Sequence, residues 1–124
     1  MAIPAQDVHS FIRSSFRSVW ALEVLCYLRG HRDQSVSAQV LVDALRASSL
    51  VVEQSFTNLV AAGLVVRDEQ GNAQYAPSSA NLDELVAASE DLYLKSPTAV
   101  RRGIVEAANP GIAAFANAFR LKDK

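Results

Sequence analysis

The most informative part of the chain reads VEQSFTNLVAAGLV, from residue 52 to residue 65. Its apolar residues recur at the three- and four-residue spacing that predicts a helix, here over about 49–62. Gly63 is expected to end this helix, because glycine readily takes the left-handed conformation found after a helix C-terminus. The positions expected to face inward are Val52, Phe56, Leu59 and Val60. The positions expected to face outward are Gln54, Thr57, Asn58 and Ala61.

A second helix is predicted immediately before this one, in the run SAQVLVDAL at residues 37–45. Ser37 has the side chain of a good N-cap, and the helix should extend to about Arg46. Its expected inward positions are Val40, Leu41, Ala44 and Leu45. A short break at 47–49 then separates the two helices.

The periodicity changes after Gly63. Residues 64–67 and 73–76 are apolar or β-favouring, and the polar, glycine-containing segment 68–72 lies between them. This arrangement predicts a β-hairpin that ends at Pro77.

One long helix is predicted before these elements, from about residue 10 to residue 29, with Gly30 as its C-cap. Its second half is apolar nearly all round, which is typical of a helix in the centre of a core. Cys26 lies in this half, and a lone thiol in an apolar helix is more often a core residue than a redox sensor.

Three further helical segments are predicted after the hairpin. Asn81 and Glu84 have the spacing of a capping pair that opens the first. Pro97 suits the first position of the second, over 97–108, because proline has no N–H to leave unsatisfied there. The last segment, over about 110–121, has an apolar ridge that favours contact with a second copy of the chain over a return onto its own domain. The ridge consists of Ile112, Phe115 and Phe119.

The order of these elements resembles bacterial winged helix-turn-helix transcriptional regulators of the MarR type and of the iron-sulfur-cluster-regulator type. The resemblance covers roughly residues 19–77, and its most specific part is the Leu-x-x-x-Gly-Leu-Val ending that starts at Leu59. It implies a mainly α fold with a small β-hairpin wing. Residues 1–80 would form the winged helix-turn-helix domain with its N-terminal helix, and residues 81–124 would form a helical, dimerising extension.

The resemblance also implies a function, in which the helix over 49–62 enters the major groove of double-stranded DNA and the protein acts as a homodimer. The DNA-binding residues carried over are Ser48, Ser49, Gln54, Thr57, Asn58, Arg46 and Arg67. Glutamine and asparagine can pair bidentately with adenine. The chain lacks the three cluster cysteines of the iron-sulfur branch, so no cofactor is carried over.

The distribution of charged residues is compatible with two other functions. The helix over 49–62 has no Lys or Arg, and the hairpin turn begins with Asp68 and Glu69, where phosphates would approach. Arg13, Arg17 and Arg46 offer the missing cations, although scattered surface arginines are the simpler interpretation of Arg13 and Arg17. The alternative is a winged-helix module that binds another regulatory protein. A third possibility is regulation by a small molecule in a pocket between the first helix and the C-terminal helices.

Composition limits the class of protein. The chain has 124 residues, is 50% hydrophobic and has a net charge of −1, as expected for one globular domain rather than a basic tail. Its single cysteine excludes an internal disulfide and a multi-cysteine zinc site, and the sequence has no apolar run that predicts a membrane span. We expect a cytoplasmic protein that binds no metal. No phosphate-binding loop or nucleophile motif indicates an enzyme.

Overall fold

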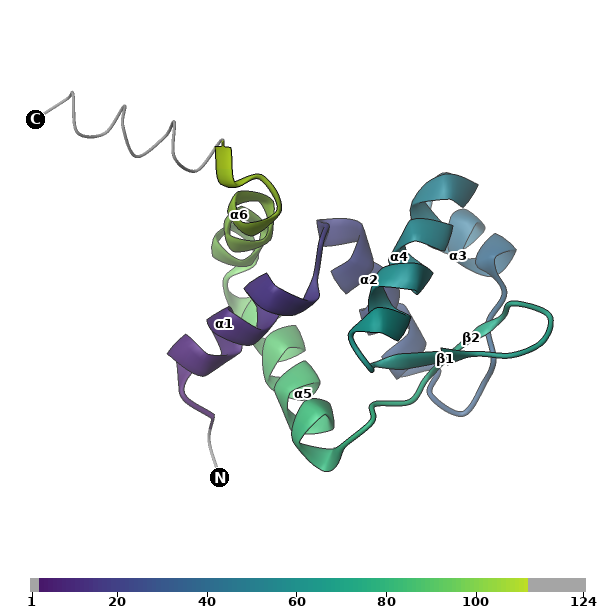
Figure 1. The fold of residues 1–124 in the computed structure, drawn as a ribbon, viewed down its shortest axis with the longest axis horizontal. Helices are drawn as coiled ribbons and strands as arrows, with labels where there is room; N and C mark the ends of the chain where they lie inside the picture. The colour runs from purple at the N-terminus through teal and green to yellow at the C-terminus, as the bar shows by residue number, and fades with distance from the viewer. Residues whose placement is uncertain (1–2, 112–124) are drawn as a thin grey trace, which may run out of the picture.

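The computed structural model describes residues 3–111 (Figure 1). This part of the chain is mainly helical, with six helices and one two-stranded antiparallel sheet. The elements in chain order are α1 (Ala5–Ser15), α2 (Val19–Gly30), α3 (Ala38–Leu45), α4 (Ser49–Ala61), β1 (Val65–Arg67), β2 (Ala73–Tyr75), α5 (Ala80–Lys95) and α6 (Pro97–Ala108). The prediction of a mainly α fold with a small hairpin is confirmed, as are the helices predicted before and after the break at 47–49.

Helix α2 is the centre of the fold. Figure 1 shows α3, α4 and the sheet on one side of α2, and α1, α5 and α6 on the other. Five of its twelve residues are buried, as the apolar sequence of this helix predicts: Ala21, Leu22, Val24, Leu25 and Leu28. Residues of α4, α5 and α6 belong to the same hydrophobic core, so the described part of the extension packs on the rest of the chain.

The helix predicted over 10–29 is two helices. The chain leaves the helical conformation at Phe16, whose φ and ψ of −107° and 119° are those of extended backbone, and Ser18 then caps α2 by accepting a hydrogen bond from the Ala21 N–H. The apolar stripe continues through this break, because Ile12 and Phe16 are both buried. Gly30 is the last residue of α2, and the C-cap is His31 rather than the predicted glycine.

Serine side chains begin four of the helices. Ser18, Ser37, Ser48 and Ser79 each accept a hydrogen bond from a backbone N–H in the first turn of the helix that follows. The predicted cap at Ser37 is confirmed, whereas α5 begins at Ser79 rather than at the predicted Asn81. Pro97 occupies the first turn of α6, as predicted.

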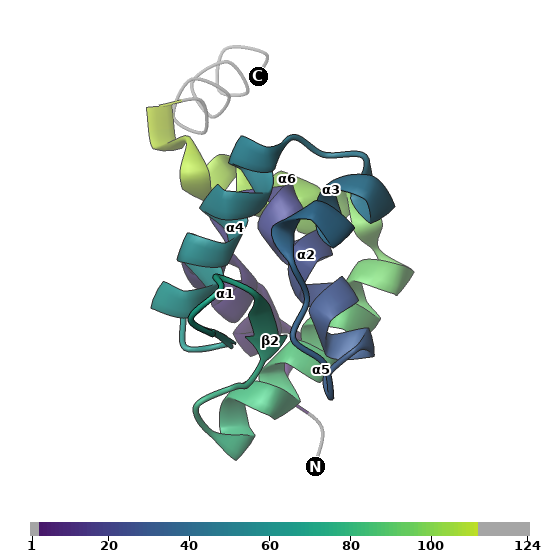
Figure 2. The same cartoon turned by 90° about the vertical axis from the view of Figure 1, so that its right-hand side faces the viewer.

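The two strands pair antiparallel, with Val65 opposite Tyr75 and Arg67 opposite Ala73. Ala73 also exchanges two backbone hydrogen bonds of 2.8 Å with Val36, which directly precedes the cap of α3. The segment before α3 therefore pairs with the outer side of the hairpin. In Figure 2, β2 lies close to the chain that enters α3.

Gly63 connects α4 to β1 in the left-handed conformation, with a φ of 77°. A Cβ atom at this position would lie 2.9 Å from the Ser78 hydroxyl, which is closer than van der Waals contact allows. Glycine therefore fits both the backbone conformation and the space, as the predicted helix end requires.

Three residues predicted to face inward lie at the surface. Val40 is 44% exposed and Val60 is 43% exposed, and Ala44 is exposed as well. Helices α3 and α4, which carry these residues, lie at the edge of the fold, and each buries a narrower stripe of side chains than the sequence predicts. The buried residues of α4 are Val52, Ser55, Phe56 and Leu59.

Helix α5 is attached to the core through polar contacts as well as apolar ones. The Arg29 guanidinium on α2 forms an ion pair of 2.8 Å with Glu90, and the Tyr75 hydroxyl on β2 donates a 2.6 Å hydrogen bond to Asp83. Burial, followed by the bond to Asp83, raises the pKa of Tyr75. Both contacts fix α5 against the helix and the strand that it covers.

Candidate functional site

A groove of about 480 Å³ runs along the exposed face of α4. It is lined by Arg17, Glu53, Gln54, Thr57, Asn58 and Ala61. Three of the residues predicted from the sequence to contact DNA therefore share one surface, and Arg17 from the break between α1 and α2 joins them. Glu53 is a lining residue that the sequence analysis missed.

Asn58 has a structural role in this groove. Its Nδ2 donates a 2.8 Å hydrogen bond to the Ser15 carbonyl, and its Oδ1 accepts a 2.9 Å bond from the Arg17 backbone N–H. Both ends of the amide are thus engaged with the chain that separates α1 from α2. These bonds use one hydrogen of Nδ2 and one lone pair of Oδ1 and hold the amide against that chain, so Asn58 is less free than Gln54 to turn its amide toward a base.

Gln54 and Thr57 remain on the outer face of α4, as predicted, and both are exposed. The Thr57 hydroxyl donates a 3.1 Å hydrogen bond to the Glu53 carbonyl one turn earlier, which leaves the lone pairs of its oxygen available as acceptors. Within residues 3–111 no hydrogen bond joins the Gln54 side chain to another residue. Among the α4 side chains in the groove, Gln54 is therefore the best suited to form hydrogen bonds with a binding partner.

The turn between α3 and α4 holds three of the predicted site residues. Arg46 is exposed and ends α3 in the left-handed conformation, with a φ of 56°. Ser48 accepts a 3.1 Å hydrogen bond from the Val51 N–H as the N-cap of α4, and Ser49 begins that helix at the surface. Arg46 and the N-terminus of α4 are therefore both exposed in the short turn that joins the two helices.

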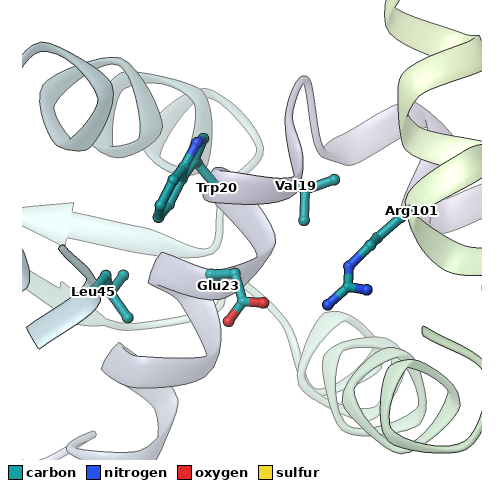
Figure 3. A pocket seen from close by; sticks show the side chains of 5 residues that line it. All are labelled: Val19, Trp20, Glu23, Leu45 and Arg101. Atoms are coloured by element: carbon teal, nitrogen blue, oxygen red, sulfur yellow. The ribbon is translucent and has the colours of Figure 1, made fainter. Parts of the chain in front are cut away.

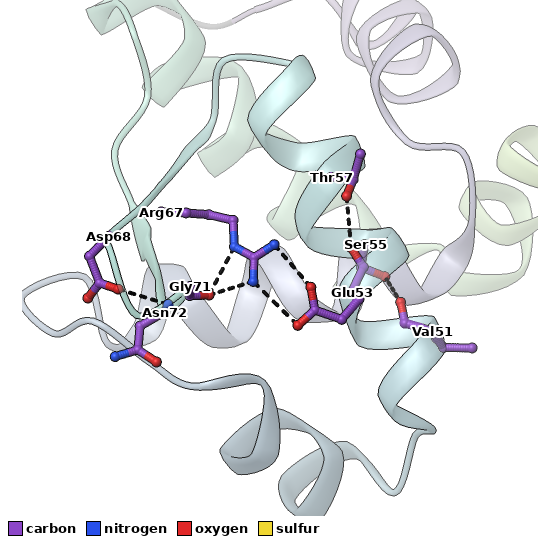
Figure 4. Close-up of polar contacts among 8 residues, drawn as sticks. All are labelled: Val51, Glu53, Ser55, Thr57, Arg67, Asp68, Gly71 and Asn72. Atoms are coloured by element: carbon purple, nitrogen blue, oxygen red, sulfur yellow. Dashed lines mark hydrogen bonds and ion pairs between the residues drawn. The ribbon is translucent and has the colours of Figure 1, made fainter.

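Arg67 lies against α4 rather than extending outward from the hairpin (Figure 4). Its guanidinium forms an ion pair of 3.0 Å with Glu53, and it donates two hydrogen bonds, of 2.9 and 2.6 Å, to the Gly71 carbonyl. It also covers the Phe56 ring, with its central carbon 4.9 Å from the ring centroid. Glu53 thus compensates the charge of Arg67. The position of Arg67 in the predicted hairpin does not by itself reveal this ion pair.

The tip of the hairpin is acidic, and the side chain of Asp68 holds its turn through hydrogen bonds. The Asp68 Oδ1 accepts hydrogen bonds from the Gln70 and Asn72 N–H groups, and Gly71 takes a φ of 82° (Figure 4). With Glu69 beside it, this tip carries two exposed carboxylates.

Two arginines lie close together behind the groove. A second pocket, of about 330 Å³, is lined by Arg13, Ser14, Phe16, Arg17, Ala107 and Ala108. Arg17 borders both this pocket and the groove along α4. Arg13 and Arg17 are four residues apart in the sequence, and they line this pocket together with the end of α6.

Cys26 packs against the core, as predicted. Burial, helped by the charges of Glu90 and Glu23, raises the pKa of its thiol to about 12. A thiol with so high a pKa is protonated at neutral pH and reacts slowly as a nucleophile.

Residues 3–111 contain no group of three or more His, Cys, Asp or Glu side chains that could hold a metal ion. None of its helices has both the length and the apolar character needed to cross a membrane. The predicted dimerising residues Ile112, Phe115 and Phe119 lie outside the described residues.

Comparison with protein-family models, with curated proteins and with solved structures gave no match to this chain.

Proposed function

We propose that this protein is a winged helix-turn-helix transcriptional regulator that binds double-stranded DNA in a sequence-specific manner through α4. The order α2, α3, α4, β1 and β2 supports this proposal, and so does the single β-bridge between Val36 and Ala73, which joins the segment before α3 to the hairpin. In this architecture α4 is the helix that enters the major groove and the hairpin is the wing.

The observation that carries the proposal is the position of Arg17 beside the outer face of α4. Arg17 and Gln54 line the same groove, so a cation and an amide face one binding surface. Arginine can bind a phosphate bidentately, which positions a protein on the duplex. Glutamine can pair with adenine, which reads the base sequence. The lack of Lys and Arg on α4 itself is thereby offset from a neighbouring element.

Asn58 contributes to this function through position. Its two hydrogen bonds hold the backbone of Ser15 and Arg17 against α4, so the side chain proposed to bind phosphate and the helix proposed to read bases keep a fixed relation. The DNA-contacting set that we propose is therefore Arg17, Arg46, Ser48, Ser49, Gln54 and Thr57. Arg67 stabilises the wing through Glu53 and Gly71.

A second candidate function is binding to another regulatory protein, favoured by the surface near the wing. Val66 on β1 is 52% exposed, and the wing tip that follows it carries Asp68 and Glu69. An exposed apolar side chain close to carboxylates suits a protein partner with a basic rim better than it suits phosphates.

Salt dependence separates the two candidates. If a homodimer uses Arg17 and Arg46 from each chain, four phosphate contacts predict an affinity loss of about 100-fold between 50 and 200 mM salt. Fluorescence anisotropy with a labelled duplex from the upstream region of its own gene, and with an unrelated duplex as competitor, measures this loss. Salt-insensitive or absent binding to DNA, together with retention of a partner protein at both salt concentrations, would favour the second candidate.

The homodimer itself stays a prediction, because its expected contacts lie beyond residue 111. Sedimentation of the intact chain and of a Phe115→Ala, Phe119→Ala variant tests it. Conversion to a monomer is the expected outcome for the variant.

A further inference from the structure

A separate pocket of about 340 Å³ lies between α2, α3 and α6, away from the groove along α4 (Figure 3). It is lined by Val19, Trp20, Glu23, Leu45 and Arg101. Its size is within the range of small-molecule sites in proteins. The sequence analysis left a small-molecule effector open, and the chemistry of the lining residues indicates which class of molecule fits.

The pocket has an apolar side and a charged side. Trp20 and Leu45 lie on one side in Figure 3, and the carboxylate of Glu23 and the guanidinium of Arg101 point toward each other on the other side. No ion pair joins Glu23 to Arg101 in the described part of the chain. Two opposite charges therefore face the same space with room between them.

Tyr93 on α5 holds both charged groups in position. Its hydroxyl donates a 2.5 Å hydrogen bond to the Glu23 Oε1, and the Arg101 guanidinium carbon lies 5.4 Å from the centroid of its ring. Burial, followed by the bond to Glu23, raises the pKa of Tyr93, so the hydroxyl keeps its proton and remains a donor. The second oxygen of Glu23 is left for another donor.

We propose that this pocket binds a zwitterionic α-amino acid with an apolar side chain. The ammonium group of the ligand would donate to Glu23, its carboxylate would accept from Arg101, and its side chain would pack on Trp20 and Leu45. A simple carboxylic acid would meet the negative charge of Glu23, and a simple amine would meet the positive charge of Arg101. Only a ligand with both charges satisfies both residues.

The site does not depend on the proposed DNA binding. Leu45 is the last residue of α3, so a ligand here would contact the end of α3 that leads by a short turn into α4, the helix proposed to bind DNA.

Titration calorimetry of the full chain with L-leucine and L-phenylalanine tests the proposal. L-Leucinamide lacks the carboxylate and N-acetyl-L-leucine lacks the ammonium group, so each should bind at least about 10-fold more weakly than L-leucine. Saturable binding of at least one of the two amino acids is expected. Absence of binding by both, or equal binding of L-leucine and both derivatives, would overturn the proposal.

Matched variants assign the two charges. Arg101→Gln should weaken L-leucine binding at least about 10-fold, whereas Arg102→Gln, an exposed neighbour outside the pocket, should leave it unchanged. Glu23→Gln retains an acceptor for the Tyr93 hydroxyl and should remove most of the difference between L-leucine and N-acetyl-L-leucine. Circular dichroism checks that each variant is folded. If Glu23→Gln is unfolded, the comparison of Arg101→Gln with Arg102→Gln still tests the proposal. Equal effects of these two substitutions on the affinity for L-leucine would overturn the assignment of Arg101 to the ligand carboxylate.

Discussion

Replacement of Asn58 by alanine should destabilise the protein although the residue lies on the face of α4 that was expected to contact DNA. The substitution removes the bond from Nδ2 to the Ser15 carbonyl and the bond from the Arg17 N–H to Oδ1, which measure 2.8 and 2.9 Å. Each such bond contributes about 1 kcal/mol net, so the free energy of unfolding should fall by about 2 kcal/mol. For a chain of 124 residues this corresponds to a decrease in Tm of about 8 °C.

Urea and thermal unfolding, followed by circular dichroism, measure this effect. With an m-value of about 2 kcal/mol/M, the urea midpoint should fall by about 1 M. Gln54→Ala is the matched control, because its exposed side chain lies on the same helix face and its loss should change stability by less than about 0.5 kcal/mol. If Asn58→Ala is as stable as this control, the amide does not hold α4 to the chain between α1 and α2, and the positioning argument for Arg17 fails.

Three further perturbations test other parts of the structure. Gly63→Ala should cost about 1–2 kcal/mol by urea unfolding, because the residue has a φ of 77° and a Cβ would lie 2.9 Å from the Ser78 hydroxyl; an unchanged midpoint would be inconsistent with this geometry. Cys26 in the native protein should react with a thiol reagent at pH 8 at least about 100-fold more slowly than in urea, because burial raises its pKa to about 12; equal rates would refute the burial. Since this pKa exceeds an unfolded value of about 8.5, the stability that Cys26 contributes should be complete below pH 8.5 and decrease as the pH rises toward 12. Tyr75→Phe should lower the free energy of unfolding by about 1 kcal/mol through loss of the hydrogen bond to Asp83, and a variant as stable as the wild type would show that this bond contributes nothing.

The elements that were predicted correctly are those fixed by local pattern. Ser37 caps α3, Gly63 follows α4 in the left-handed conformation, and the strands of the hairpin lie where the periodicity changes. In each case the signal and the structure that it specifies lie within a few residues of each other.

The break between α1 and α2 could not be predicted in the same way. The apolar stripe runs through Ile12 and Phe16 without interruption, so the pattern alone favours one helix. The break is held by Asn58, which lies 43 residues beyond the Ser15 carbonyl and 41 beyond the Arg17 N–H in the sequence. A contact of this range depends on how α4 packs, which the local pattern does not specify.

The candidate site was partly predicted for the same reason. Gln54 and Thr57 were assigned to the outer face of α4 from helical spacing, and they lie there. The return of Arg67 onto Glu53 depends on the hairpin turn that brings Gly71 within reach of the guanidinium, and the groove position of Arg17 depends on the break. The positions of the charged residues in the site thus depend on tertiary structure, whereas the outward face of α4 can be predicted from helical spacing.

The most direct test of the proposed function is selection of DNA from a pool of random-sequence duplexes by the purified full chain, followed by affinity measurements on the enriched sequence. We expect one enriched motif, a loss of affinity for it in Gln54→Ala and in Arg17→Gln, and unchanged affinity in Arg102→Gln. Enrichment of no motif, or an enriched motif bound equally well by all three variants, would contradict the proposal that α4 and Arg17 form a DNA-binding surface.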